Sequence, residues 1–229
     1  TTPVFTNKDS LYLPPAQQYR KEFTVARKVR RATIYATALG IYELHLNGKR
    51  VSDEYFAPGW TDYRQRAYYQ TYDVTKLVAS GENAIGAWVA DGWYSGYIGF
   101  GLLTSIGTEK IGRYTYGKTP ALMAQLEIEY SDGTQETIVT DKTWKVTTNG
   151  PIREADFLMG EMHDARLEMA GWTQVGFNDK NWNQAILASE NGSTFATFYE
   201  WRNPETPGAK IEVKGRPIDL GFKRPPKLE

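Results

Sequence analysis

The chain has 229 residues and no cysteine, and 27 lysines and arginines balance 27 aspartates and glutamates. That balance disfavours nucleic acid or an anionic membrane as a partner, and the lack of thiols excludes disulfides, cysteine nucleophiles and cysteine-ligated zinc. The sequence has neither a run of about 18 apolar residues nor the apolar region of a signal peptide, so we expect no membrane-spanning segment. Aromatic residues make up 14% of the chain, which suits a β-sandwich core and a sugar-binding surface alike.

The first fifty residues predict an extended lead-in followed by short antiparallel strands. Residues 1–20 have little periodicity, whereas residues 21–27 and 31–38 alternate apolar and polar side chains, as half-buried strands do. Residues 41–46 alternate likewise and run into Asn47-Gly48, a pair that tolerates positive φ at both central positions of a type I′ turn. We therefore predict a hairpin whose return strand begins at Lys49.

The middle of the chain predicts further strands and one long loop. Residues 67–72 are rich in aromatic and β-branched types and indicate a strand, after which Asp73 can cap a single helical turn through residue 78. Residues 84–90 are apolar enough for a buried strand that ends at Asp91. The glycine-rich residues 96–120 predict a loop longer than a hairpin connection, of a length that is usually functional or mobile.

The last third predicts strands, weak helices and an irregular tail. Residues 122–130 alternate most cleanly, a turn leads into a strand over 134–139, and another strand is expected at 144–146. About two helical turns are expected over residues 161–169 and one over 178–182. Repeated prolines break any regular element after residue 191. We predict an all-β antiparallel sandwich over residues 21–190, with an irregular linker or tail over 191–229.

Several segments also resemble one family. In order, LHLNGKRV, APGWTDYRQRAYYQTYDVT and GENAIGAWVADGWYSG resemble the N-terminal β-sandwich domain of bacterial α-L-rhamnosidases of glycoside hydrolase family 78. IREADFLMGEMHDAR and GWTQVGFNDKNW resemble the end of the same region, so the likeness covers roughly residues 22–185. The resemblance implies a jelly-roll, galactose-binding-like sandwich in a periplasmic or extracellular enzyme that removes terminal L-rhamnose by inversion. It also implies a partner, a catalytic helical-barrel domain that carries the reacting carboxylates and is not visible in this chain.

Catalysis by the chain itself has little support in the residues. There are two histidines, His45 and His163, with no GxSxG elbow and no histidine spacing that suits zinc. Glycoside hydrolysis instead needs two carboxyl groups in one cleft, roughly 6.5–9.5 Å apart in an inverting enzyme. The acids available for such a pair are Asp53, Glu54, Asp62, Asp91, Glu154, Asp156, Glu161 and Asp164. A self-contained glycosidase therefore stays open as an alternative, although the resemblance argues against it.

Carbohydrate binding is the favoured activity. A sugar site needs an exposed aromatic ring and a few planar polar groups, and two stretches beside the long loop supply both. The candidate residues are Trp60, Asp62, Tyr63, Arg64, Asp91, Trp93 and Tyr94. We therefore expect a non-catalytic accessory domain that binds rhamnose-containing glycans or packs against the catalytic barrel. The alternative is a pure scaffold, in which Trp60 and Trp93 are core residues that close the sandwich.

The resemblance further implies a calcium site, because related modules hold rhamnose through a calcium ion. In them the metal lies on an acidic or amide pair before the PGW and on the loop after the DGWY. Asp53 and Glu54 match the pair and offer hard oxygen ligands. Residues 99–117 depart from the pattern, since they contain only Glu109 as an acid, and calcium prefers 6 to 8 oxygens. A solvated turn at Asp53 and Glu54 is favoured over calcium ligation.

Overall fold

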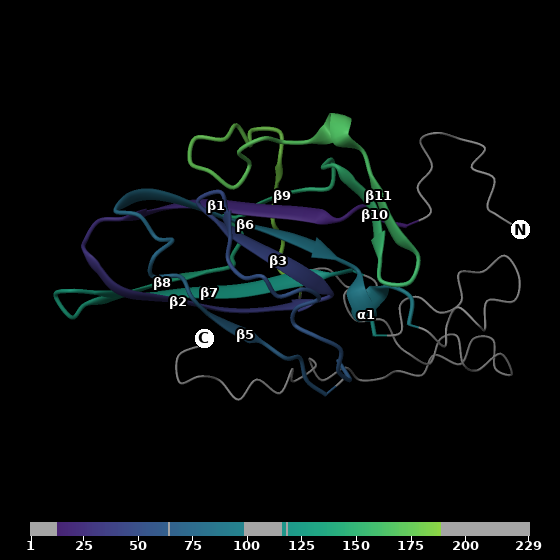
Figure 1. Ribbon diagram of the computed structural model, residues 1–229, viewed down its shortest axis with the longest axis horizontal. Helices are drawn as coiled ribbons and strands as arrows, with labels where there is room; N and C mark the ends of the chain where they lie inside the picture. The colour runs from purple at the N-terminus through teal and green to yellow at the C-terminus, as the bar shows by residue number, and fades with distance from the viewer. Residues whose placement is uncertain (1–12, 64, 99–115, 118, 189–229) are drawn as a thin grey trace, which may run out of the picture.

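The computed structural model describes residues 13–63, 65–98, 116–117 and 119–188 (Figure 1). Its strands are β1 (Gln17–Val25), β2 (Val29–Leu39), β3 (Ile41–Leu46), β4 (Lys49–Arg50), β5 (Gln70–Asp73), β6 (Gly81–Ala90), β7 (Ala121–Tyr130), β8 (Gln135–Val139), β9 (Lys145–Thr147), β10 (Ile152–Asp156), β11 (Gly160–His163) and β12 (Asn183–Gln184). The helices are α1 (Gly92–Ser95) and a 3₁₀ turn (Ala165–Leu167). Within these described ranges no helix is long and apolar enough to cross a membrane.

Two antiparallel sheets stack face to face (Figure 1). One sheet has the order β12-β9-β1-β6-β3-β4 and the other has the order β5-β2-β7-β8, while β10 and β11 form a separate hairpin. Buried side chains from both sheets form the main core, among them Val25, Ile34, Leu44, Leu46, Val89, Leu126, Ile128 and Trp144. The predicted all-β antiparallel sandwich is confirmed.

The clearest local predictions are confirmed. Strand β3 alternates buried and half-buried side chains along its whole length. Asn47 and Gly48 have φ values of 51° and 80°, as a type I′ turn requires. The Asn47 side chain also donates to the Leu77 carbonyl at 2.9 Å and accepts from the Ala84 amide at 2.9 Å. This asparagine therefore joins its own turn to the β5–β6 connection and to the start of β6.

Two predicted elements are wrong or shifted. Strand β5 covers Gln70–Asp73 and leaves out residues 67–69, because Ala67 is instead buried against a cluster of tyrosines. The helix expected over residues 161–169 is wrong: strand β11 pairs with β10 and the 3₁₀ turn follows. Asp164 accepts the amide hydrogen of Arg166 at 3.1 Å, which starts a tight turn where a longer helix was expected.

Three further predicted segments differ in how they compare with the structure. Strand β1 begins at Gln17, inside the residues expected to form the lead-in. Residues 178–182 hold one turn, closed by the bond from the Trp182 amide to the Asp179 carbonyl at 2.9 Å. The irregular tail expected over 191–229 lies outside the described residues.

The outer face of the six-stranded sheet is covered by the chain that follows the β10–β11 hairpin. Trp172 lies on this face with its ring 5.3 Å from Trp88 and 6.1 Å from Trp182. Gly86 makes this approach possible, because a Cβ atom there would lie 2.6 Å from the Trp172 ring. The covering segment therefore needs a glycine in β6.

Arg20 in β1 fastens the covering segment to the sheet. Its buried guanidinium donates to the carbonyls of Trp172 at 2.9 Å and Gln174 at 3.1 Å. It also forms ion pairs with Glu22 at 2.6 Å and with Asp179. These acceptors satisfy a charge that would otherwise be costly to bury.

Candidate functional site

Trp60, Tyr63, Trp93 and Tyr94 lie together at one end of the sandwich, which α1 marks at the right of Figure 1. Strand β6 ends there at Ala90, Asp91 follows, and α1 turns the chain and carries Trp93 and Tyr94. The loop between β4 and β5, which carries Trp60 and Tyr63, is tied to the same end by the bond from the Tyr42 amide to the Ala57 carbonyl at 2.9 Å. Sequence reasoning therefore selected two stretches that lie together in space.

Tyr63 and Tyr94 form the buried floor of this end. The Tyr63 ring lies 5.4 Å from Tyr94 and 5.2 Å from Tyr116, both edge to face. The Tyr63 hydroxyl donates to the Gly59 carbonyl at 3.1 Å. Burial raises the pKa of the Tyr63 and Tyr94 hydroxyls above the ordinary tyrosine value. Since both side chains are fully buried, they can support a ligand site but offer it no surface.

Trp60 is exposed over this floor. Its side chain is 53% exposed, and its indole nitrogen donates to the Tyr116 hydroxyl over a long 3.4 Å contact. The residues before it turn sharply, with a cis peptide bond between Ala57 and Pro58 and a φ of 98° at Gly59. The alternative that Trp60 is a core residue is therefore wrong, because the structure presents the indole to solvent.

The charged candidate residues differ in burial. Asp62 is half-buried, and its carboxylate accepts from the Gln65 side chain at 3.1 Å. Asp91 is buried at the start of α1, and its carbonyl accepts the Ser95 amide hydrogen at 3.1 Å. Arg64 lies outside the described residues. Asp62 is thus the candidate acid that lies nearest in sequence to the exposed indole.

An exposed aromatic triad, formed by Phe56, Trp93 and Phe157, lies at the same end. The Phe157 ring is 5.1 Å from both Phe56 and Trp93, and Phe56 is 6.2 Å from Trp93. Phe56 is 50% exposed and Phe157 is 45% exposed, whereas Trp93 is half-buried and also packs on the tyrosine floor. Trp93 is therefore neither fully buried in the core nor fully exposed for stacking against a ligand.

Sequence reasoning missed two members of this triad. Phe56 lies in a loop of irregular conformation, and Phe157 follows a strand that no alternation predicted. The available signal was the run Phe157-Leu158-Met159, three apolar residues between an aspartate and a glycine. Such a run is unusual at a turn, where polar residues and glycine prevail.

Asp156 anchors the β10–β11 hairpin that carries Phe157. Its buried carboxylate accepts the amide hydrogens of Leu158 at 2.9 Å and Met159 at 3.0 Å through Oδ1. Oδ2 accepts the amide hydrogen of Tyr97, just after α1, at 2.8 Å. Both carboxylate oxygens accept hydrogen bonds from backbone amides, so Asp156 joins the hairpin to the chain that follows α1.

The residues of the predicted calcium pair are exposed. The Ser52 hydroxyl accepts the Glu54 amide hydrogen at 3.1 Å, and the Arg50 guanidinium donates to the Glu54 carbonyl at 2.8 Å. Among the residues that the structure describes, no group of three or more histidine, cysteine, aspartate or glutamate side chains could hold a metal ion. Residues 99–115, the loop from which the resemblance draws the other calcium ligands, lie outside the described residues, so calcium binding stays a prediction.

Both histidines pair with glutamates. As expected, His45 shares a face of β3 with Glu43, and the two side chains meet at 2.8 Å. The bond from His45, followed by the nearby charge of Arg50, holds the pKa of Glu43 below its ordinary value. His163 lies 2.8 Å from Glu168 on the surface. Each imidazole is thus part of a local pair with a glutamate.

Comparison with known proteins gives the family. The family model described as the α-L-rhamnosidase N-terminal domain matches residues 27–200. An α-L-rhamnosidase of Streptomyces avermitilis is 53% identical over 177 residues, which cover 77% of this chain and 16% of that protein. An α-L-rhamnosidase of Formosa agariphila is 39% identical over 217 residues, which cover 95% of this chain and 22% of that protein. The chain thus spans about a fifth of the length of these relatives.

Solved structures agree with this assignment. The crystal structure of the Streptomyces avermitilis α-L-rhamnosidase complexed with L-rhamnose matches with a TM-score of 0.69 and 51% identity, over 75% of this chain and 16% of that one. The native enzyme from Aspergillus terreus matches with a TM-score of 0.68 and 40% identity, over 81% of this chain and 21% of that one. Because the family model covers well over half of the sequence, the chain belongs to the family of α-L-rhamnosidase N-terminal domains.

Proposed function

We propose that this chain is a non-catalytic accessory domain of an α-L-rhamnosidase and that it holds L-rhamnose-containing glycans near the catalytic domain. The observation that carries the proposal is the exposed indole of Trp60, presented above a rigid floor of buried tyrosines. The apolar face of a pyranose ring stacks on such a surface, and the 6-methyl group of rhamnose adds to the apolar contact. Asp62 supplies a carboxylate two residues away for the sugar hydroxyls.

The non-catalytic part of the proposal rests on the comparisons. The matched stretch is 16% to 22% of the rhamnosidase relatives, which leaves most of their length for a separate catalytic domain. In this chain the buried Asp156 carboxylate is committed to backbone amides. We therefore propose that hydrolysis belongs to a separate domain, which the family resemblance implies to be a helical barrel. The same resemblance favours the periplasm or the exterior of a bacterium for the whole protein.

Isothermal titration of the chain with L-rhamnose tests the proposal. We expect binding heat in the wild type, loss of affinity of on the order of tenfold in Trp60→Ala, and a smaller loss in Trp60→Phe, which keeps a stacking ring. Titrations with calcium, with a chelator and with Asp53→Ala test the calcium pair separately. If the heat of binding requires calcium and is absent in Asp53→Ala, calcium is part of the sugar site.

Two other outcomes lead to other functions. If no condition gives heat, the chain is a scaffold for its partner domain and the glycan site is rejected. If the chain alone hydrolyses an aryl rhamnoside, the non-catalytic assignment is rejected and a pair of its own carboxylates must be sought.

A further inference from the structure

The tip of the β10–β11 hairpin presents three consecutive apolar side chains to solvent. Phe157, Leu158 and Met159 are 45%, 39% and 45% exposed. Surface turns are normally built from glycine and polar residues, and an exposed apolar group of this size usually marks a contact surface. Neither the core nor the proposed sugar contact of Trp60 uses these three side chains.

The hairpin tip is held in place before any partner arrives. Asp156 fixes the amides of Leu158 and Met159 and ties the hairpin to the amide of Tyr97, two residues after α1. A Cβ atom on Gly96 would lie 2.5 Å from the Asp156 carboxylate, so only glycine permits this close approach. A preformed surface loses little conformational entropy on binding, which favours affinity.

The tip continues into the aromatic triad. The centroid of the Phe157 ring lies 5.1 Å from those of Phe56 and Trp93. One continuous surface, here called the apolar tip, is therefore formed by Phe56, Trp93, Phe157, Leu158 and Met159. No member of the apolar tip is charged. Trp93 rests on the buried tyrosine floor, which makes the surface continuous with a folded core.

We propose that the apolar tip is the surface through which this domain packs against a neighbouring domain of the longer rhamnosidase polypeptide. The inference rests on the proposed accessory function and names the contact for it. The relatives have about four-fifths of their length outside the matched stretch, so they contain ample chain to supply such a domain. The partner surface is apolar and irregular, since Leu158 and Met159 are flexible aliphatic groups that adapt to protein side chains.

The same chemistry argues against other occupants. A glycan is recognised by ring faces together with planar polar groups, which the consecutive Leu158 and Met159 do not offer. Nucleic acid and anionic lipid need lysine or arginine, and the apolar tip has neither.

Hydroxyl-radical footprinting tests the proposal because methionine and aromatic side chains react readily. Oxidation of Phe157 and Met159 is compared between the 229-residue chain and the full-length polypeptide that carries it, with exposed Tyr69 as the internal control. We expect oxidation at the tip to slow by about fivefold or more in the longer protein, since the centre of an interface excludes water. Equal oxidation in both proteins overturns the proposal, and so does slowing of Phe157 and Met159 in the short chain by L-rhamnose.

A double variant gives an independent measurement. Because Leu158 and Met159 are exposed, Leu158→Ser with Met159→Ser should change the melting temperature of the short chain by no more than about 1–2 °C. In the longer protein, calorimetry should show this domain unfolding apart from the rest, whereas an unchanged transition contradicts the proposal. The rhamnose titration with Trp60 variants does not use the apolar tip, so failure of the glycan site and failure of the interface are distinguished.

Discussion

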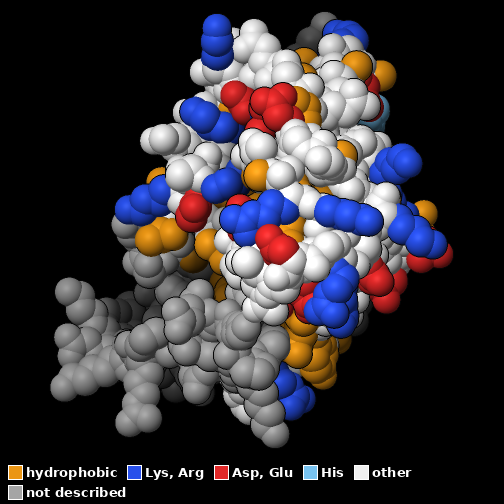
Figure 2. All heavy atoms as spheres, turned by 90° about the vertical axis from the view of Figure 1, so that its left-hand side faces the viewer, with side chains coloured by type: hydrophobic (Ala, Val, Ile, Leu, Met, Phe, Trp, Pro, Cys, Tyr) orange, Lys and Arg blue, Asp and Glu red, His pale blue; other side chains and the backbone are white. Residues whose placement is uncertain are grey.

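The end of the sandwich formed by the β1–β2 and β7–β8 turns is charged (Figure 2). The opposite end, which is formed by α1 and the β10–β11 hairpin (Figure 1), exposes the rings of Phe56, Trp60 and Phe157. At the charged end Arg27 pairs with Asp132 at 3.6 Å, and Arg30 pairs with Glu129. Figure 2 shows basic side chains spread over this face with acids between them. Arg27 and Arg30 thus pair with acids of the same domain while their side chains stay largely exposed to water.

The aromatic end differs because its exposed rings have apolar support underneath. Trp60 and Trp93 lie over fully buried Tyr63 and Tyr94. Exposed ion pairs contribute only about 0–1 kcal/mol each, whereas a buried aromatic side chain contributes several. The difference indicates that buried tyrosines support the exposed rings of the aromatic end, which are available for contacts with other molecules.

The largest effect is expected from Tyr63→Ala. Loss of a fully buried ring should lower the free energy of unfolding by about 3–5 kcal/mol, because it leaves a cavity under Trp60 and Trp93. Tyr63→Phe should cost only about 1 kcal/mol, the loss of the hydroxyl bond to Gly59. Urea unfolding measures both variants, and equal losses would mean that the ring does not support the aromatic end.

A change of pH is expected to have an intermediate effect on the free energy of unfolding. Raising the pH removes a contribution at the aromatic end, and lowering it removes one at the charged end. Burial raises the pKa of Tyr63, so its contribution is complete below its ordinary value of 10.0 and is lost as the pH rises above it. Hydrogen bonds from Thr134 lower the pKa of Asp132, so its contribution is present above 3.8 and is lost as the pH falls. Unfolding free energies measured across pH should therefore show a shallower alkaline decline in Tyr63→Phe and an unchanged one in Asp132→Asn.

The smallest effect is expected from Arg30→Ala at the charged end. The guanidinium is largely exposed, so losing its pair with Glu129 should change the free energy of unfolding by less than about 1 kcal/mol. Added salt should reduce even this difference. A loss near that of Tyr63→Ala would show that the charged end is as strongly coupled to the core as the aromatic end.

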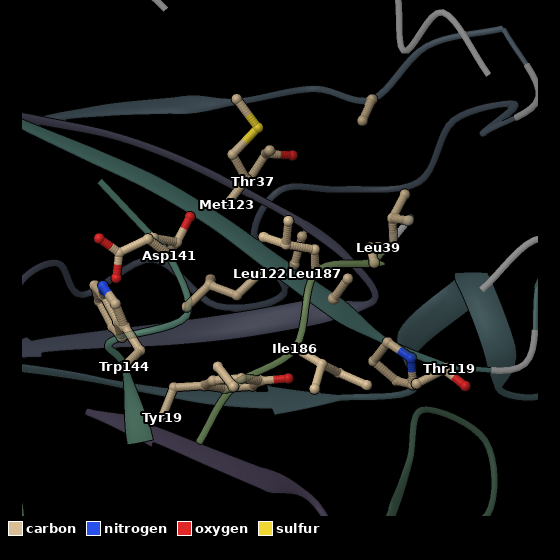
Figure 3. Close-up of a pocket in the computed structure, with 17 residues that line it drawn as sticks. Tyr19, Thr37, Leu39, Thr119, Leu122, Met123, Asp141, Trp144, Ile186 and Leu187 are labelled. Atoms are coloured by element: carbon tan, nitrogen blue, oxygen red, sulfur yellow. The ribbon is translucent and has the colours of Figure 1, made fainter. Parts of the chain in front are cut away.

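The strands that the sequence predicted best are those with one buried face. Strand β3 and the second half of β7 alternate because their inner side chains fill the space between the sheets. The first half of β7 does not alternate, and there Leu122 and Met123 both line one pocket (Figure 3). Strand β10 was missed because it buries the carboxylates of Glu154 and Asp156, which reverses the expected pattern. Residues 67–69 read as a strand by composition, but Ala67 packs into the tyrosine floor and draws this stretch away from the ladder.

The candidate site was predictable only in part. Composition identified Trp60 and Trp93, because each follows a turn signal beside polar residues. Phe56 and Phe157 are about 100 residues apart, and only the folded loop and hairpin bring their rings to 5.1 Å. The burial of Tyr63 and Tyr94 likewise depends on Tyr116, which comes from a distant part of the chain.

The guanidinium of Arg20 also bears on where a shortened version of this domain can end. A chain cut after the β10–β11 hairpin would keep every long strand, but it would lack the carbonyls of Trp172 and Gln174 and the carboxylate of Asp179. Without the segment the guanidinium would be hydrated, but Trp88 and the outer face of the six-stranded sheet would lose the packing of Trp172. The smallest version expected to fold and express well therefore extends through Gln184, where β12 pairs with β9.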